Sequence, residues 1–223
     1  MIRHAPLSRV LWIGGAQWSG KTSVAQLLAA RHPLLLYVYD YHDARSHADR
    51  SCADPERFPH SHAFLAALDR NPDDVWVTPS PDVMAADARH SFRERFAMVC
   101  EDLAALPAGV PVLAEGWGLR PDLIAPLLDD RRRAVFLVPT EDFRERQVRT
   151  LPRAGRLQTP GVSDPDRAQR NRVERDRLLA RDVVESATRL GLRVITVDGS
   201  QSVAEVAALV EAQFRPFLPP WRY

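Results

Sequence analysis

The chain has 223 residues, 45% of them hydrophobic and 26% charged, with a formal net charge of +1. This length is sufficient for one domain with a substantial core, and the small net charge gives no global field that would favour nucleic acids or acidic membranes. There is no signal-peptide stretch and no apolar run of bilayer length, and two cysteines are too few for a disulfide framework. We therefore expect a cytoplasmic protein with no membrane association. Residues 1–223 are expected to form a single domain, and the protein is expected to be a monomer or a homodimer.

The first predicted elements are a buried strand at Val10–Ile13, a glycine-rich loop and a helix with one apolar face. The loop Gly15–Thr22 fits the pattern glycine, four residues, glycine, lysine, threonine, which is typical of a phosphate-binding loop. Backbone N–H groups at such a helix start point inward and attract anions. Lys21, the only lysine in the chain, is expected to reach the outer phosphates, and the Thr22 hydroxyl to ligate magnesium. The predicted nucleotide-binding residues here are Gly15, Ala16, Gln17, Trp18, Ser19, Gly20, Lys21, Thr22 and Ser23.

The next predicted strand, Leu34–Asp40, is an apolar run that ends in a carboxylate, as expected for a parallel strand covered on both faces. Ligands of open α/β sheets bind beyond the carboxyl ends of the strands. Asp40 is therefore expected beside the phosphate-binding loop, where it would orient an acceptor hydroxyl and accept its proton. Asp43 is the second candidate for this role.

Residues 41–107 lack a strand pattern and are expected to form turns and helices, inserted between the second and third strands. His60–Arg70 is typical of a short amphipathic helix, and Ser80-Pro81-Asp82 of the start of a longer one. Part of the insertion is expected to cover the sheet and the rest to form the acceptor pocket. A metal site is an alternative, although the spacing of the histidines and cysteine matches no zinc pattern. The residues of that metal site would be His42, His47, Cys52, His60 and His62. The candidate contacts to the acceptor are His42, Arg45, Trp117 and Arg120. For Trp117, packing in the core is the other interpretation.

Three further strands are predicted at Val110–Gly116, Arg133–Val138 and Leu192–Val197, each separated from the next by helical stretches. Such alternation is typical of a mainly parallel sheet with helices on both faces. Glu115, at the end of the third strand, is expected to assist Thr22 in holding magnesium through water.

Arginine dominates residues 141–181, and the stretch Thr150–Pro165 contains three prolines and two glycines. We therefore predict a helix, a mobile lid over residues 150–165 and a second helix. Most arginines on the two helices are expected to form a solvated face with acidic partners. Arg149, Arg153 and Arg156 lie on or beside the loop without nearby acids and are candidates for clamping phosphates, the first two in catalysis and Arg156 in nucleotide binding.

A GTPase is disfavoured because the guanine-binding Asn-Lys-x-Asp element needs a second lysine, and a mechanical ATPase because the third strand lacks its acidic pair. The candidates that remain fit phosphoryl transfer to a small hydroxyl acceptor, which needs a phosphate cradle, a metal, a carboxylate and closing cations.

Several segments together resemble the P-loop kinases of nucleosides, nucleoside monophosphates and small metabolites, including uridine kinase-like, shikimate kinase-like and 2-phosphoglycerate kinase-like proteins. These segments are GGAQWSGKTS, VYDYHD, VLAEGWGLRP, VFLVPTEDFRERQVR and VITVDGS. The resemblance covers most of the chain except residues 41–107. It implies an α/β three-layer P-loop NTPase sandwich with five parallel strands in the order 2-3-1-4-5, ATP with magnesium and an arginine lid. It also implies that Asp40 is the strand-two acid and that Gly199 and Ser200 lie beside the adenine.

The favoured function is an ATP-dependent small-molecule kinase whose acceptor is a metabolite, a nucleoside-like or an antibiotic-like compound. The alternative is a nucleotide-binding regulatory or nucleic-acid-associated ATPase that uses its arginine-rich flank as a phosphate-backbone patch.

Overall fold

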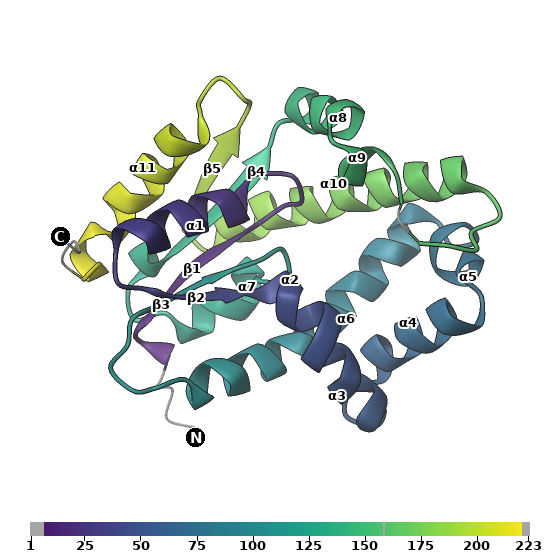
Figure 1. Cartoon of the computed structure of the whole chain (residues 1–223), viewed down its shortest axis with the longest axis horizontal. Helices are drawn as coiled ribbons and strands as arrows, with labels where there is room; N and C mark the ends of the chain where they lie inside the picture. The colour runs from purple at the N-terminus through teal and green to yellow at the C-terminus, as the bar shows by residue number, and fades with distance from the viewer. Residues whose placement is uncertain (1–6, 158, 220–223) are drawn as a thin grey trace.

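The computed structural model describes residues 7–157 and 159–219, with the side chain of Arg153 outside the described part. Its centre is one sheet of five parallel strands in the order β2-β3-β1-β4-β5 (Figure 1). This confirms the predicted fold class and strand order. The strands are β1 (Val10–Gly15), β2 (Leu35–Val38), β3 (Val112–Glu115), β4 (Ala134–Pro139) and β5 (Arg193–Val197).

Helices join successive strands and pack on the sheet. The α-helices are α1 (Lys21–Arg31), α2 (Tyr39–His42), α3 (Ala48–Ala53), α4 (Pro59–Arg70), α5 (Asp73–Trp76), α6 (Pro81–Ala105), α7 (Pro121–Ile124), α8 (Glu141–Thr150), α9 (Pro152–Gly155), α10 (Pro165–Arg189) and α11 (Val203–Phe214). A π-helix, η2 (Asp43–His47), and three 3₁₀ turns, η3 (Ala125–Leu127), η4 (Arg131–Arg133) and η5 (Arg215–Phe217), complete the described elements.

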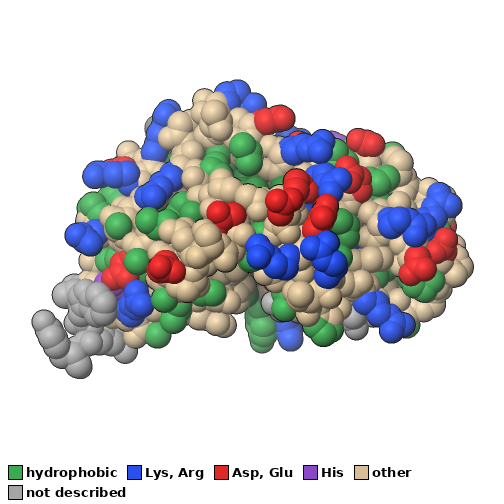
Figure 2. Space-filling view, turned by 90° about the horizontal axis from the view of Figure 1, so that it is seen from above, with side chains coloured by type: hydrophobic (Ala, Val, Ile, Leu, Met, Phe, Trp, Pro, Cys, Tyr) green, Lys and Arg blue, Asp and Glu red, His purple; other side chains and the backbone are tan. Residues whose placement is uncertain are grey.

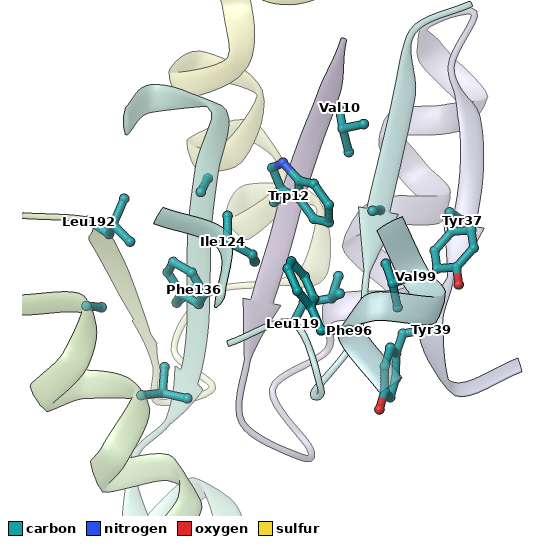
Figure 3. Packing of buried hydrophobic residues seen from close by; sticks show 14 of the residues in the cluster. Val10, Trp12, Tyr37, Tyr39, Phe96, Val99, Leu119, Ile124, Phe136 and Leu192 are labelled. Atoms are coloured by element: carbon teal, nitrogen blue, oxygen red, sulfur yellow. The ribbon is translucent and has the colours of Figure 1, made fainter. Parts of the chain in front are cut away.

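Side chains of β1 alternate between the two faces of the sheet, as the period of a strand requires. Leu11 and Ile13 pack with α1 and α11, which lie side by side on one face (Figure 1). Trp12 belongs to the opposite layer, in which α6, α7 and α10 cover the sheet, and Figure 3 shows it among Phe96, Leu119 and Phe136. The two layers bury the central strands completely, which explains their continuous apolar sequences.

The second strand is shorter than predicted. It ends at Val38, and the chain turns at once into α2 and then the π-helix η2, so that Asp40 lies in the first turn of a helix and not at the strand end. Val38 pairs with Glu115, the last residue of the neighbouring strand β3, and Asp40 beyond this pair is exposed. Asp40 on α2 and Asp43 on η2 therefore both follow the carboxyl end of β2.

Residues 41–107 form helices, and α6 covers the sheet through Phe96, Val99 and Leu103. The segments α4 and α5 extend beyond the sheet, at the right of Figure 1. The predicted lid contains the short helix α9 and a following loop, while the interpretation of residues 41–107 as an acceptor-binding insertion and of 150–165 as a lid stays a prediction. In the described part of the chain, no helix combines the length and the apolar character needed to cross a bilayer.

Candidate functional site

The loop Gly15–Thr22 connects the end of β1 to α1 and is packed on one side only. Gly15 has φ of 127°, and a Cβ atom there would overlap the carbonyl group of Leu137 on β4. The Ala16 N–H donates to that same carbonyl oxygen at 2.9 Å. Gly20, directly before α1, has φ of 80°, and a Cβ atom there would meet nothing within 4 Å. Glycine is therefore required by packing at the first position and by backbone conformation at the second, and the loop is open around Gly20.

Lys21 is held inside the loop. Its side chain is 7% exposed, and its ammonium group donates to the Ala16 carbonyl oxygen at 2.5 Å. Burial lowers the pKa of Lys21, and the charges of Asp40, Glu115 and Asp176 oppose that effect. The charges of three carboxylates thus act on the ammonium group at the start of α1.

The two residues predicted to hold magnesium are in direct contact. The Thr22 hydroxyl donates to Glu115 Oε1 at 3.1 Å. Glu115, at the end of β3, is 1% exposed, and burial raises its pKa to about 7. The charge of Asp40 raises this pKa further, whereas the charge of Lys21 and the hydrogen bond from Thr22 lower it. A hydroxyl and a carboxylate oxygen are ligands that magnesium accepts, and it commonly uses only one or two protein ligands besides phosphates and water. This donor pair therefore fits the predicted ion.

The two candidate bases differ in their surroundings. Asp40 is exposed on α2, close enough to raise the pKa values of both Lys21 and Glu115 through its charge. Asp43 lies one turn further, on η2, and forms an ion pair with Arg95 of α6. Asp40 is therefore the carboxylate next to the loop, whereas Asp43 is engaged in an ion pair.

The expectation that Arg149 has no acidic neighbour is wrong. Arg149 is exposed on α8 and pairs with Glu145, one helical turn earlier, at 3.6 Å. Arg156 is exposed in the loop after α9. The predicted role of Arg153 concerns a side chain outside the described residues.

Three arginines of α8 and α10 are buried and so do not belong to a solvated face. Arg144 is 1% exposed, and Arg172 and Arg175 are 9% exposed. Burial lowers the pKa of both Arg144 and Arg172, and the three guanidinium nitrogens of Arg144 are buried without a hydrogen-bond partner in the described structure. Arg172 lies over the Trp18 ring of the loop, with 5.6 Å from its guanidinium carbon to the ring centroid.

A pattern in the sequence could have revealed two of these arginines. On α10 they share one stripe, at helical spacing, with the apolar residues that face the sheet. The buried stripe consists of Ala168, Arg172, Arg175, Asp176, Leu179, Ala180, Val183 and Ala187.

The loop after β5, which contains the predicted adenine-side residues Gly199 and Ser200, packs against α8. The backbone N–H and the hydroxyl of Ser200 donate to one Asp198 carboxylate oxygen at 2.8 and 2.6 Å. Arg146 donates to the Asp198 carbonyl oxygen at 2.7 Å, and a Cβ atom at Gly199, which has φ of 82°, would overlap the Phe143 ring. Gly199 and Ser200 thus belong to a tight turn fixed by its neighbours.

A cavity of about 500 Å³ lies between α4, α5, α6 and α10, and one of its lining residues, Arg172, lies over Trp18 of the Gly15–Thr22 loop. Of the four predicted acceptor contacts, Trp117 is among the described residues that line this cavity. His42 stacks on Tyr37 instead, Arg45 lies over the Tyr41 ring, and Arg120 is buried and donates to the Leu179 carbonyl oxygen.

The alternative metal cluster of the insertion is not assembled. In residues 7–157 and 159–219, no group of three or more His, Cys, Asp or Glu side chains is placed to hold a metal ion. His47 contacts Asp102 at 2.8 Å, and His60 stacks on His90.

No family model matches the sequence, and a comparison with curated proteins found no match.

Proposed function

We propose that the chain is an ATP-dependent kinase that transfers the γ-phosphoryl group to a hydroxyl group of a small molecule, which is a metabolite, a nucleoside-like or an antibiotic-like compound. The observation that carries the proposal is the contact between Thr22 and Glu115 beside the buried Lys21. It brings a hydroxyl, a carboxylate and an ammonium group to the carboxyl edge of β1 and β3, which is where ligands of such sheets bind. The strand order β2-β3-β1-β4-β5 is the one that the P-loop kinase resemblance implied.

Each residue has a role that follows from its position. The backbone N–H groups of the Gly15–Thr22 loop and the Lys21 ammonium group would bind the triphosphate, and Thr22 with Glu115 would hold magnesium, which supplies charge neutralisation when bound. Asp40 would orient the acceptor hydroxyl and accept its proton while the acceptor oxygen bonds to the γ-phosphorus and ADP leaves with the bridging oxygen. Lid arginines closing over the site would exclude water.

The burial of Arg172 beside the loop adds a cation to this proposal at a position other than those predicted from the sequence. Arg172 lies over Trp18 of the loop, and Arg175 pairs with Asp176, whose charge acts on Lys21. Phosphoryl transfer depends mainly on such positioning and charge neutralisation.

The test is a screen of a metabolite pool with ATP by mass spectrometry, comparing the wild type with Lys21→Ala and Asp40→Asn. The proposal expects one compound class to gain the mass of a phosphoryl group with the wild type alone. ATP hydrolysis that proceeds equally without any acceptor, or phosphorylation that survives in Lys21→Ala, would overturn it.

The alternative, a nucleic-acid-associated ATPase, has less support. Specific nucleic-acid binding surfaces are strongly basic, whereas the face of the molecule in Figure 2 shows Lys and Arg side chains interspersed with Asp and Glu. The net charge of +1 agrees with that picture. Salt-dependent binding to single- or double-stranded nucleic acid would favour this alternative.

A further inference from the structure

The cavity between α4, α5, α6 and α10 has walls that are mainly aromatic and aliphatic. Phe64 of α4, Trp76 of α5, Phe92 of α6 and Trp117 after β3 all line it. Phe64 meets Trp76, and Phe92 meets Trp117, in edge-to-face contacts with ring centroids 6.2 and 4.7 Å apart. A volume of about 500 Å³ is that of a site for a drug-sized ligand. Its lining favours a ligand with a flat apolar body.

Two of the three arginines in the cavity wall, Arg95 and Arg175, are already paired with carboxylates of the protein. Arg95 is paired with Asp43. Arg175 donates twice to Asp176, at 3.0 and 2.7 Å, and its guanidinium carbon lies 5.2 Å from the Trp76 ring centroid. A ligand phosphate or carboxylate would have to compete with these carboxylates and lose its own hydration. The wall charges therefore favour an uncharged ligand.

Arg172, the third arginine in the wall, joins the cavity to the loop. It lies over the Trp18 ring and donates to the Ala154 carbonyl oxygen of α9. On the same helix, Asp176 forms an ion pair with Arg175, and the charge of Asp176 acts to raise the pKa of Lys21. One side chain, Arg172, thus contacts both the cavity and the Gly15–Thr22 loop.

A few polar groups are available to orient a hydroxyl group. Besides the arginines and Asp43, the polar residues that line the same cavity are His60, Asp74, Asp87, Ser91 and Thr159. Because most of the exposed wall is apolar, a buried sugar would leave several of its hydroxyl groups without a partner.

We infer that this cavity binds an uncharged, largely aromatic small molecule that carries a hydroxyl group. This ligand class rests on the cavity itself, and its role as the phosphoryl acceptor rests on the proposed kinase function. Nucleoside monophosphates and simple sugars are then not the acceptors.

The test measures binding by calorimetry, without turnover. The probes are naphthalen-2-ylmethanol and 4-phenylphenol, compared with naphthalene-2-carboxylate, AMP and glucose. The inference expects the two uncharged aromatic alcohols to bind the wild type and Lys21→Ala with similar affinity, and the other three probes to bind at least about tenfold more weakly. Tighter binding of AMP, glucose or the carboxylate, or no binding of either alcohol, would overturn it.

Substitutions locate the binding. Ala63→Phe on α4 and Ala88→Phe on α6 place a ring at the cavity wall from facing helices, and each should weaken binding of the alcohols about tenfold or more. Ala66→Phe is the matched control, because Ala66 is exposed on the same helix as Ala63 but does not line the cavity. Since Ala63 is itself exposed, its substitution is compatible with folding, which circular dichroism would verify. An equal loss in Ala66→Phe, or no loss in either cavity variant, would contradict the assignment.

The outcomes also separate this inference from the kinase proposal. Binding of the alcohols without phosphoryl transfer from ATP would support the ligand class and count against the kinase. Phosphorylation of a sugar or a nucleoside monophosphate would support the kinase and overturn the ligand class.

Discussion

The Thr22 hydroxyl donates to Glu115 Oε1 at 3.1 Å and so joins the first turn of α1 to the end of β3. If the pair holds magnesium, removing either partner should raise the magnesium concentration needed for ATP binding. We expect Thr22→Ala and Glu115→Gln to weaken MgATP binding about tenfold or more while binding of ATP in EDTA stays as in the wild type. Calorimetric titrations with and without magnesium would measure this. Equal magnesium dependence in all three proteins would contradict the assignment.

Asp→Asn substitutions at Asp40 and Asp43 test which carboxylate accepts the proton of the acceptor hydroxyl. Asp40→Asn keeps the size of the side chain but cannot accept a proton, so transfer should fall about 100-fold or more while MgATP still binds. Asp43→Asn removes the partner of Arg95 and should act mainly on stability. Turnover assays and urea unfolding of both variants would separate the two effects. Unchanged turnover in Asp40→Asn would show that Asp40 is not the general base, and would assign that role to Asp43 or to no carboxylate.

Gly15 and Gly20 differ in what a methyl group would meet. At Gly15 it would overlap the Leu137 carbonyl group, so Gly15→Ala should lower the free energy of unfolding by about 3 kcal/mol or more. At Gly20 the space is open, so Gly20→Ala should cost only about 1 kcal/mol, for the left-handed backbone. Gly20→Ala should nevertheless weaken MgATP binding about tenfold, because the methyl group occupies the open side of the loop. Equal unfolding free energies for the two variants would show that the loop is not packed as described.

Asp102 of α6 fixes the segment that carries both candidate bases. It accepts hydrogen bonds from Tyr37 at 2.9 Å and Arg50 at 3.0 Å, and His47 Nε2 lies at 2.8 Å. Burial acts to raise the pKa of Asp102, but the hydrogen bonds of His47 and Tyr37 and the charges of His47 and Arg50 outweigh it and hold the pKa below its ordinary value. The stabilisation is therefore present above the pKa of the unfolded chain, about 3.9, and lost as the pH falls through the lower folded pKa.

We expect Asp102→Asn to lower the free energy of unfolding at pH 7 by about 1–3 kcal/mol and to flatten its decline in acid. Glu101→Gln is the matched control, because Glu101 is 46% exposed and pairs with Arg50 and Arg57 at the surface, where a pair is worth about 0–1 kcal/mol. Urea unfolding at pH 7 and below pH 4 would measure both. An acid decline as steep in Asp102→Asn as in the wild type would refute this account.

The sequence was sufficient to predict the sheet because each central strand is a continuous apolar run followed by a helix. The Thr22–Glu115 contact was also predictable, since both residues follow parallel strands at one edge of the sheet. The cap at Ser80 fixed the start of α6, and Ser80 accepts the expected backbone hydrogen bond from Val83.

The surroundings of the site were less predictable. Arginine is usually exposed, so the burial of Arg172 and Arg175 depends on Asp176 and on tryptophans far away in sequence. The His47–Asp102 contact likewise joins residues 55 positions apart. The cavity depends on how α4, α5, α6 and α10 pack, and no single segment encodes that packing.

The proposed kinase function depends most on the binding of a triphosphate by the Gly15–Thr22 loop. Calorimetry of the purified chain with MgATP, for the wild type and Lys21→Ala, tests this directly. We predict saturable binding by the wild type that is weakened about 100-fold or more in Lys21→Ala. No binding of magnesium nucleotides by the wild type, or equal binding by both proteins, would contradict the central claim.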